Sequence, residues 1–146
     1  MTYEAKDYWE KRGLNYRQEK EVSPDADWTE LAGFLSGMLK KLQPQTILEV
    51  GCGYGKVLQL LMNLGILSTQ ITGFDISQSQ LNQAKDFLSG QDCELICGDF
   101  LTDLPDRKWD LGITRRTLIH IAPTQIATAL SVMTEKCRKS LIIESY

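Results

Sequence analysis

A glycine-rich turn at the end of an apolar run carries the strongest chemical signal in this sequence. Residues 47–55 read ILEVGCGYG, and an apolar segment of helical period follows them. Gly51 allows a tight turn, while Gly53 and Gly55 remove side chains where a ligand must lie against the backbone. The next helix offers free N–H groups at its N-terminus. The turn therefore predicts a binding site; the alternative is a turn that needs glycines only for its shape.

An acidic residue beside this turn indicates which kind of ligand it holds. Glu49 lies two positions before Gly51. Dinucleotide enzymes use similar turns to hold a pyrophosphate, and a carboxylate is poorly placed beside two phosphates. A ligand that carries an ammonium or a sulfonium group suits this position better. We therefore favour a cationic ligand over a dinucleotide.

Two further acids are expected at the same edge of a sheet. Asp75 ends a second apolar run, where it can accept both ribose hydroxyls of a nucleoside, and Ile76 can lie against one face of a base. Asp99 ends a third run, where it can accept a hydrogen bond from an exocyclic amine, with Phe100 stacking nearby. Together with Glu49, these acids close three successive strands. Doubly wound sheets bind their ligands at that edge.

The segments ILEVGCGYG, GFDIS and GDF together resemble the class I S-adenosylmethionine-dependent methyltransferases, over roughly residues 28–146. The resemblance implies S-adenosylmethionine as the cofactor, with its methionine part in the glycine loop. It also implies that Asp75 binds the ribose and that Asp99 and Phe100 bind the adenine. The expected cofactor-binding residues are Tyr16, Glu49, Gly51, Cys52, Gly53, Gly55, Asp75, Ile76, Asp99, Phe100, Thr114 and Arg115.

Other segments resemble a narrower group, the methylases associated with pseudaminic acid and other sugar biosynthesis. Residues 110–121 read DLGITRRTLIHI and residues 141–146 read LIIESY, similar to that group's segments after the fourth strand and at the end of the fifth. The early Trp9, Gly13 and Tyr16 also resemble its N-terminal segment, whose tyrosine and nearby arginine lie over the cofactor. The resemblance therefore implies that residues 1–27 form a cap over the cofactor site and that Tyr16 contacts the cofactor.

The single histidine, His120, is the candidate catalytic residue. It follows the predicted fourth strand, where methyl donor and acceptor should meet. As a general base it can take a proton from an attacking hydroxyl or ammonium group; a positioning role and a purely structural role are the alternatives. Because methyl transfer from a sulfonium is an in-line displacement, alignment alone can supply most of the acceleration. Nearby, Arg115 and Arg116 indicate an anionic acceptor, unless they form a salt bridge or a solvated face.

An alternation of strands and helices must position these residues. Strands are predicted at residues 46–50, 70–76, 94–98, 109–114 and 140–145. Helices are predicted at residues 3–12, 28–42, 56–64, 78–88 and 124–137. Asp27 and Ser77 are the expected N-caps, and Gly13 with Asn15 should end the first helix. Such alternation requires right-handed crossovers. We expect one α/β domain over residues 1–146, Rossmann-like and doubly wound, with a mostly parallel sheet of about five strands.

The resembled family has two more strands after the fifth, and this sequence lacks them. The chain ends at Tyr146, directly after the predicted fifth strand. We therefore expect a C-terminally truncated domain whose last strand presents an unpaired apolar edge. Because such an edge favours pairing with a second copy, the sequence predicts a homodimer through this strand.

Composition and charge narrow the classes of partner. With 16 basic and 19 acidic side chains, the net charge of −3 argues against nucleic acid, which needs a basic stripe. No apolar run approaches the roughly 20 residues of a membrane span, and residues 1–21 are too charged for a signal peptide. The four cysteines lack metal-ligand spacing, so no metal is expected, and Cys93 and Cys97 should be buried. These features favour a cytoplasmic protein with a small-molecule methyl acceptor.

Three functions remain open from the sequence. The favoured one is an S-adenosylmethionine-dependent methyltransferase that acts on an oxygen or nitrogen atom of a small molecule. The others are a non-catalytic module that binds S-adenosylmethionine or S-adenosylhomocysteine, and an NAD-dependent oxidoreductase. Glu49 and Asp99 speak against the oxidoreductase, since a dinucleotide site needs neither. In each case we expect Trp9, Trp28 and Trp109 to be packing anchors rather than platforms for a substrate.

Overall fold

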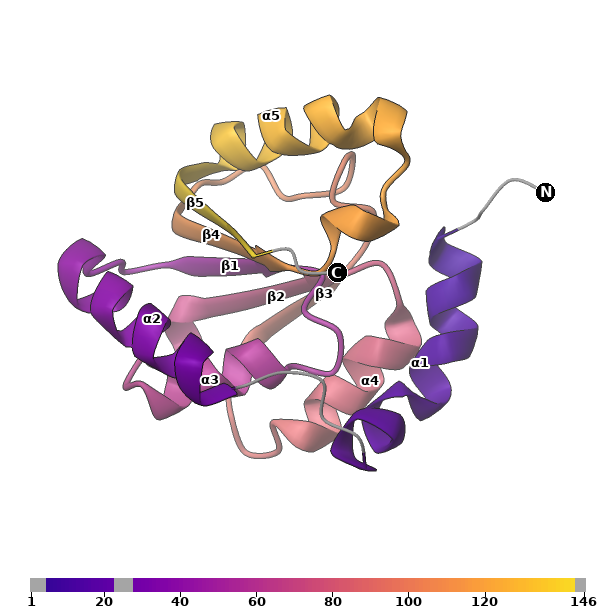
Figure 1. Ribbon diagram of the computed structural model, residues 1–146, viewed down its shortest axis with the longest axis horizontal. Helices are drawn as coiled ribbons and strands as arrows, with labels where there is room; N and C mark the ends of the chain where they lie inside the picture. Colours follow the sequence, from indigo (N-terminus) through magenta and orange to yellow (C-terminus); the bar gives the residue numbers. More distant parts are fainter. Residues whose placement is uncertain (1–4, 23–27, 144–146) are drawn as a thin grey trace.

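A five-stranded parallel sheet forms the centre of the molecule (Figure 1). The computed structural model describes residues 5–22 and 28–143. The strands are β1 (Ile47–Val50), β2 (Ile71–Asp75), β3 (Glu94–Cys97), β4 (Trp109–Arg115) and β5 (Cys137–Ile143). Their order across the sheet is β3-β2-β1-β4-β5, and each neighbouring pair is parallel. The predicted Rossmann-like α/β fold is confirmed.

The strand order reverses at β1, which is the centre of the sheet. From β1 the chain proceeds outward through β2 to β3 and then returns to β4 on the other side. Glu49 of β1 is therefore flanked by Gly73 of β2 and Ile113 of β4. Since ligands of doubly wound sheets bind beside such a reversal, β1 is the strand whose carboxyl end should face the ligand.

Helices cover both faces of the sheet. They are α1 (Ala5–Val22), α2 (Trp28–Leu42), α3 (Lys56–Asn63), α4 (Gln78–Phe87) and α5 (Ile126–Lys136), with short 3₁₀ turns η1 (Ser68–Gln70), η2 (Leu118–His120) and η3 (Pro123–Gln125). α2, α3 and α4 lie on one face and α5 lies on the other (Figure 1). Alternate residues of β1 feed the two cores: Ile47 belongs to the first, and Leu48 packs with Met133 of α5 in the second. Burial on both faces explains why β1 is mostly apolar.

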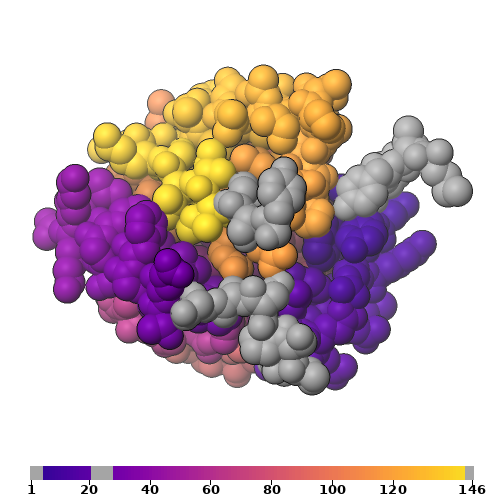
Figure 2. All heavy atoms as spheres, in the orientation of Figure 1, coloured from indigo at the N-terminus to yellow at the C-terminus, as the bar shows by residue number. Residues whose placement is uncertain are grey.

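The first helix is longer than predicted. α1 runs from Ala5 to Val22 without a break at Gly13 or Asn15, so the predicted helix end was wrong. Gly13 is buried against α4, where a Cβ atom would overlap Ser79 Oγ. A glycine inside a helix costs about 1 kcal/mol relative to alanine, but here it lets two helices approach closely. α1 and α2 lie on opposite sides of the face seen in Figure 2.

The last helix and strand also differ from their predicted bounds. α5 begins at Ile126, after the turn η3, and β5 begins at Cys137 rather than at Ser140. Parallel pairing with β4, in which Cys137 lies opposite Trp109, draws the end of the predicted helix into the sheet. The predicted cap Ser77 is confirmed, because its Oγ accepts the Gln80 N–H. The predicted cap Asp27 lies outside the described residues.

The two edges of the sheet differ in character. β3 forms one edge, and Cys97 is exposed there while Cys93 is half-buried, so the prediction that both are buried was wrong. β5 forms the other edge and exposes Arg138 and Lys139 as well as Ile142. Within residues 5–22 and 28–143, no helix is long and apolar enough to cross a membrane. The same residues contain no cluster of side chains suited to a metal ion.

Candidate functional site

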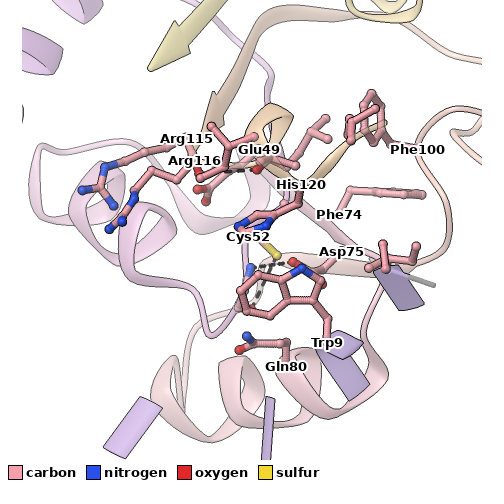
Figure 3. A pocket seen from close by; sticks show the side chains of 18 of the residues that line it. Trp9, Glu49, Cys52, Phe74, Asp75, Gln80, Phe100, Arg115, Arg116 and His120 are labelled. Carbon is pink, nitrogen blue, oxygen red and sulfur yellow. Dashed lines mark hydrogen bonds between the residues drawn. The ribbon is translucent and has the colours of Figure 1, made fainter. Parts of the chain in front are cut away.

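A cavity of about 1070 Å³ lies at the carboxyl ends of β1 to β4 (Figure 3). The strand ends contribute the three predicted acids Glu49, Asp75 and Asp99 to its wall. α1 adds Tyr16, and η2 adds His120. With two exceptions, the predicted cofactor-binding residues line this one cavity, although they are spread over the chain from α1 to the end of β4.

The two exceptions, Gly55 and Thr114, lie behind the cavity wall. Gly55 packs against Leu88, where a Cβ atom would approach the Leu88 side chain to 2.9 Å. Thr114 is fully buried in β4, and its Oγ1 has no hydrogen-bond partner among the described residues. Both therefore lie where they can support the site but not where they contact its contents.

The glycine turn after β1 has the backbone that its sequence indicates. Gly51 and Gly53 have φ angles of 73° and 53°, which favour glycine. A Cβ atom on Gly51 would overlap Thr117 Oγ1, the group that donates a hydrogen bond to the Val50 carbonyl over 3.2 Å. A Cβ atom on Gly53 would meet nothing closer than Gln80 Oε1, at 3.8 Å. Gly51 is therefore needed for packing, whereas Gly53 borders open space in the cavity.

Glu49 is a buried acid with an unused acceptor. Only 2% of its surface is exposed, and its Oε2 has no hydrogen-bond partner among the described residues. Burial raises the pKa of Glu49 well above its ordinary value; Asp75 raises it further, and Arg115 opposes the shift. A buried carboxylate without a partner is costly. The arrangement suits a ligand that brings a positively charged N–H donor.

Asp75 supports the turn as well as lining the cavity. Its Oδ2 accepts the Gly53 N–H over 2.8 Å, and its Oδ1 accepts the Ser77 N–H over 2.9 Å. Burial raises the pKa of Asp75, and the two backbone hydrogen bonds oppose that rise. The carboxylate thus ties the glycine turn to the start of α4, and its remaining lone pairs are available to a ligand.

The far end of the cavity combines an acid with aromatic rings. Asp99 Oδ1 accepts the Leu101 N–H over 2.9 Å, which fixes the bend after β3. Phe100 is buried and belongs to the same apolar cluster as Phe74. Ile76 is half-buried and also lines the cavity. This end offers both a flat apolar surface and a hydrogen-bond acceptor, which suits a heteroaromatic ring that carries an amine.

Aromatic residues of α1 close the site opposite the sheet. The Trp9 ring meets the Tyr16 ring at 5.4 Å and the His120 ring at 4.9 Å, both edge-on. α1 is held in place by Glu10, whose carboxylate accepts the N–H groups of Gln78 and Ser79 at the start of α4. α1 thus contributes to the cavity wall, and a cap formed by residues 1–27 over the cofactor stays a prediction. Trp9, which we expected only to pack, lies in the cavity wall against the candidate catalytic histidine (Figure 3).

Several other cavity residues were not predicted. Gln80 is 2% exposed and lines the cavity, and its Oε1 has no hydrogen-bond partner among the described residues. Trp28 also lines the cavity, with the Arg115 guanidinium 4.6 Å from its ring centroid. Trp109, in contrast, is a buried anchor as expected and donates a hydrogen bond to Thr72 Oγ1. Gln80 could have been predicted as a cavity residue because it is a polar residue on the buried face of α4.

Comparison with known proteins identifies the family. Residues 47–140 match the family described as "Methyltransferase domain". The chain belongs to this family. The matched segment of the methyltransferase domain contains the glycine turn, Asp75, Asp99 and His120, while Tyr16 and the rest of α1 precede it. The resemblance to class I methyltransferases is thereby confirmed.

A curated relative matches part of the methyltransferase domain. The malonyl-[acyl-carrier protein] O-methyltransferase of Priestia megaterium is 36% identical over 75 residues. The match covers 51% of this chain and 27% of the relative. The matched segment therefore spans about a quarter of that relative's length.

Solved structures share the fold. CalS10 of Micromonospora echinaspora, an amino pentose methyltransferase with S-adenosylmethionine bound, has a TM-score of 0.71 at 15% identity; the match covers 100% of this chain and 58% of CalS10. Magnesium protoporphyrin IX methyltransferase of Synechocystis PCC 6803 has a TM-score of 0.69 at 16% identity; the match covers 93% of this chain and 73% of that protein. An S-adenosylmethionine-dependent methyltransferase of Clostridium acetobutylicum has a TM-score of 0.69 at 17% identity; the match covers 87% of this chain and 53% of that protein. At such identities the likeness concerns the fold.

Proposed function

We propose that this methyltransferase domain binds S-adenosylmethionine and transfers its methyl group to an oxygen or nitrogen atom of a small molecule. The observation that carries the proposal is Glu49. Its carboxylate is buried in the central strand, at the reversal of the sheet, and lines the cavity with one oxygen that has no partner among the described residues. A cationic amino-acid ligand satisfies that oxygen, whereas a pyrophosphate would be repelled by it.

The described residues fit the cofactor. Glu49 Oε2 and Gln80 Oε1 are buried acceptors without partners, which matches a ligand with several N–H and O–H donors. The space beside Gly53 admits a ligand against the backbone. We assign the methionine part to Glu49 and the loop of Gly51, Cys52 and Gly53, the ribose to Asp75, and the adenine to Ile76, Asp99 and Phe100, with Tyr16 as a further contact. Arg115, also predicted to bind the cofactor, lines the cavity beside Trp28.

The chemistry needs little from the protein beyond alignment. When bound, S-adenosylmethionine supplies a methyl group on a positively charged sulfur, and the leaving group is a neutral thioether. The cavity residues must orient the acceptor and exclude water. His120 is packed edge-on against Trp9, so its imidazole has a restricted orientation. We assign His120 to hold the acceptor or to take its proton.

The acceptor class is the finer part of the proposal. Residues 110–121 resemble a segment of methylases of sugar biosynthesis, and CalS10 is named as an amino pentose methyltransferase. Both favour a sugar-derived small molecule over a macromolecule. A cytoplasmic location remains a prediction from the sequence.

Ligand-dependent stability tests the proposal directly. The chain is heated with S-adenosylmethionine, S-adenosylhomocysteine or NAD; a ligand at 100 times its dissociation constant stabilises the fold by about 2.7 kcal/mol. We expect both S-adenosyl compounds to raise the Tm and NAD to leave it unchanged. Stabilisation by NAD alone would contradict the proposal. A panel of amino sugars, hydroxyl sugars and sugar acids is then tested for S-adenosylhomocysteine formation, and binding without turnover would favour the non-catalytic module.

A further inference from the structure

The cavity has a charge bias opposite to that of the whole chain. The chain carries 16 basic and 19 acidic side chains. Among the described residues that line the cavity, basic side chains outnumber acidic ones: Arg12, Lys20, Lys56, Arg115 and Arg116 against Glu49, Asp75 and Asp99. Because Arg12 forms an ion pair with Glu19, the positive charge that the cavity offers to a ligand depends on the other cations, among them Lys56 and Arg115.

Two of these cations, Lys56 and Arg115, lie against an aromatic ring. Arg12 forms an ion pair with Glu19, but neither Lys56 nor Arg115 forms an ion pair with any residue that the structure describes. Both instead approach the Trp28 ring: the Arg115 guanidinium carbon lies 4.6 Å from the ring centroid, and Lys56 Nζ lies 5.7 Å from it. Stacking on an aromatic ring restricts a cation without neutralising it. Lys56 and Arg115 therefore offer positive charge to a ligand.

These cations lie away from the adenine end of the cavity. In Figure 3 the Arg115 and Arg116 side chains extend in the direction opposite to Phe100 and Asp75. Lys56 is the first residue of α3, directly after the glycine turn. The basic side of the cavity is thus separate from the residues that we assign to the nucleoside.

The cofactor alone does not balance this charge. S-adenosylmethionine has an ammonium, a sulfonium and a carboxylate, so it brings one net positive charge into the cavity. Its single carboxylate can pair with only part of the basic side. We propose that the methyl acceptor carries a carboxylate or phosphate group, and that Lys56 and Arg115 bind this group beside Trp28. This inference rests on the proposed function and names its substrate class.

The anionic group serves as the anchor of the acceptor and not as the atom that is methylated. Pairing with two cations ties up its lone pairs in charge-assisted hydrogen bonds, which lowers its nucleophilicity. The methylated oxygen or nitrogen is then a different atom of the same molecule, near His120. The acceptor class is therefore an acidic or phosphorylated small molecule with a separate hydroxyl or amino group.

Anion titrations test the anchor without knowledge of the acceptor. The protein is labelled with ¹⁵N, saturated with S-adenosylhomocysteine, and titrated with inorganic phosphate or with acetate, using chloride at equal ionic strength as the reference. The indole N–H signal of Trp28, assigned by its loss in Trp28→Phe, reports on the basic side. Trp109 is buried and lies outside the cavity lining, so its signal is the internal control.

We expect the Trp28 signal to shift with phosphate, with acetate or with both. The anion that binds more tightly identifies the anionic group of the acceptor as a phosphate or a carboxylate. Lys56→Gln and Arg115→Gln should each weaken anion affinity about tenfold or more, the range for a hydrogen bond to a charged group. The matched controls Lys85→Gln and Arg138→Gln alter exposed cations outside the cavity and should retain wild-type affinity. Circular dichroism verifies the fold of each variant.

Two results would overturn the inference. One is a Trp28 shift no larger in phosphate or acetate than in chloride. The other is loss of S-adenosylhomocysteine affinity in Lys56→Gln and Arg115→Gln with unchanged anion affinity, since these cations would then bind the cofactor's own carboxylate. Failure of the wild-type protein to bind any S-adenosyl compound refutes the proposed function instead. The same titrations of the ligand-free protein then decide separately whether Lys56 and Arg115 bind anions.

Discussion

Replacing Glu49 by glutamine should change stability and ligand affinity in opposite directions. In the absence of ligand, Glu49 is 2% exposed and one of its oxygens has no partner among the described residues. Removing a buried carboxylate that nothing compensates should leave the protein at least as stable as wild type near neutral pH. Removing the same group from a site for a cationic ligand should weaken binding. If Glu49 were instead a structural acid of the core, Glu49→Gln would lower the stability of the protein.

The pH dependence of stability has a definite sign. Burial raises the pKa of Glu49 in the folded protein well above its ordinary value of 4.5. The folded state therefore binds a proton more tightly than the unfolded chain. The contribution of Glu49 to the free energy of unfolding is fully present below pH 4.5 and is lost as the pH rises through the raised pKa of Glu49. Glu49→Gln should lack this loss, so the difference in unfolding free energy between variant and wild type should grow with pH across that window.

The affinity change follows from one charge-assisted hydrogen bond. Such a bond contributes about 1.5–3 kcal/mol, so Glu49→Gln should weaken S-adenosylmethionine binding by roughly 10- to 150-fold. Because the ligand pairs with the ionised carboxylate, wild-type affinity should rise with pH, with uptake of a proton by the buffer on binding. Titration calorimetry in two buffers of different ionisation enthalpy measures both quantities. Glu135→Gln, on an exposed face of α5, is the matched control.

The refuting result for Glu49 is specific. If Glu49→Gln binds S-adenosylmethionine as wild type does, with no proton release in either protein, the carboxylate does not hold the ammonium group. If the variant instead unfolds more easily at neutral pH while Glu135→Gln does not, Glu49 is a structural acid.

Three further predictions concern the turn and the sheet edge. Asp75→Ala should weaken cofactor binding by about 1.5–3 kcal/mol; unchanged affinity by calorimetry, with the fold intact, would remove Asp75 from the site. Gly53→Val places a β-branched residue at a φ of 53° beside the cavity and should abolish binding while circular dichroism stays close to wild type; surviving binding would mean that the turn is only structural. We predict that β5 pairs with a second copy, so Ile143→Lys should shift the chain toward monomer in light scattering across a wide concentration range, and a wild type that is monomeric throughout would contradict this.

The sheet could be predicted because its strands obey a simple physical rule. β1 and β2 are buried on both faces, so their sequences are short apolar runs bounded by turn residues. The continuous α1 could not be predicted in the same way. A glycine weakens a helix unless its small size allows a close contact with another element. For Gly13 that contact is with Ser79, which is far away in the sequence. Local propensity therefore favoured a break at Gly13, whereas the contact between α1 and α4 favours a helix.

The residues at the strand ends could be predicted from the sequence pattern, whereas on α1 only Tyr16 was predicted, from a family resemblance, and Trp9 was missed. Glu49, Asp75 and Asp99 follow apolar runs, so the parallel sheet brings them to one edge whatever the details of the loops. Trp9 and Tyr16 share a face only if α1 continues through Gly13. The mistaken helix end therefore hid the role of Trp9, which could otherwise have been inferred from its seven-residue separation from Tyr16.

A chain of hydrogen bonds links α1 to the glycine turn. Ser77 Oγ donates to the Trp9 carbonyl over 3.1 Å, and the Ser77 N–H donates to Asp75 Oδ1. The other oxygen of Asp75 accepts the Gly53 N–H. Because the Asp75 carboxylate accepts hydrogen bonds from both Ser77 and Gly53, the packing of α1 and the shape of the glycine turn depend on the same residue. In the proposed cofactor site, Asp75 therefore has two functions: it offers its own lone pairs to the ligand, and it holds the glycine loop in place.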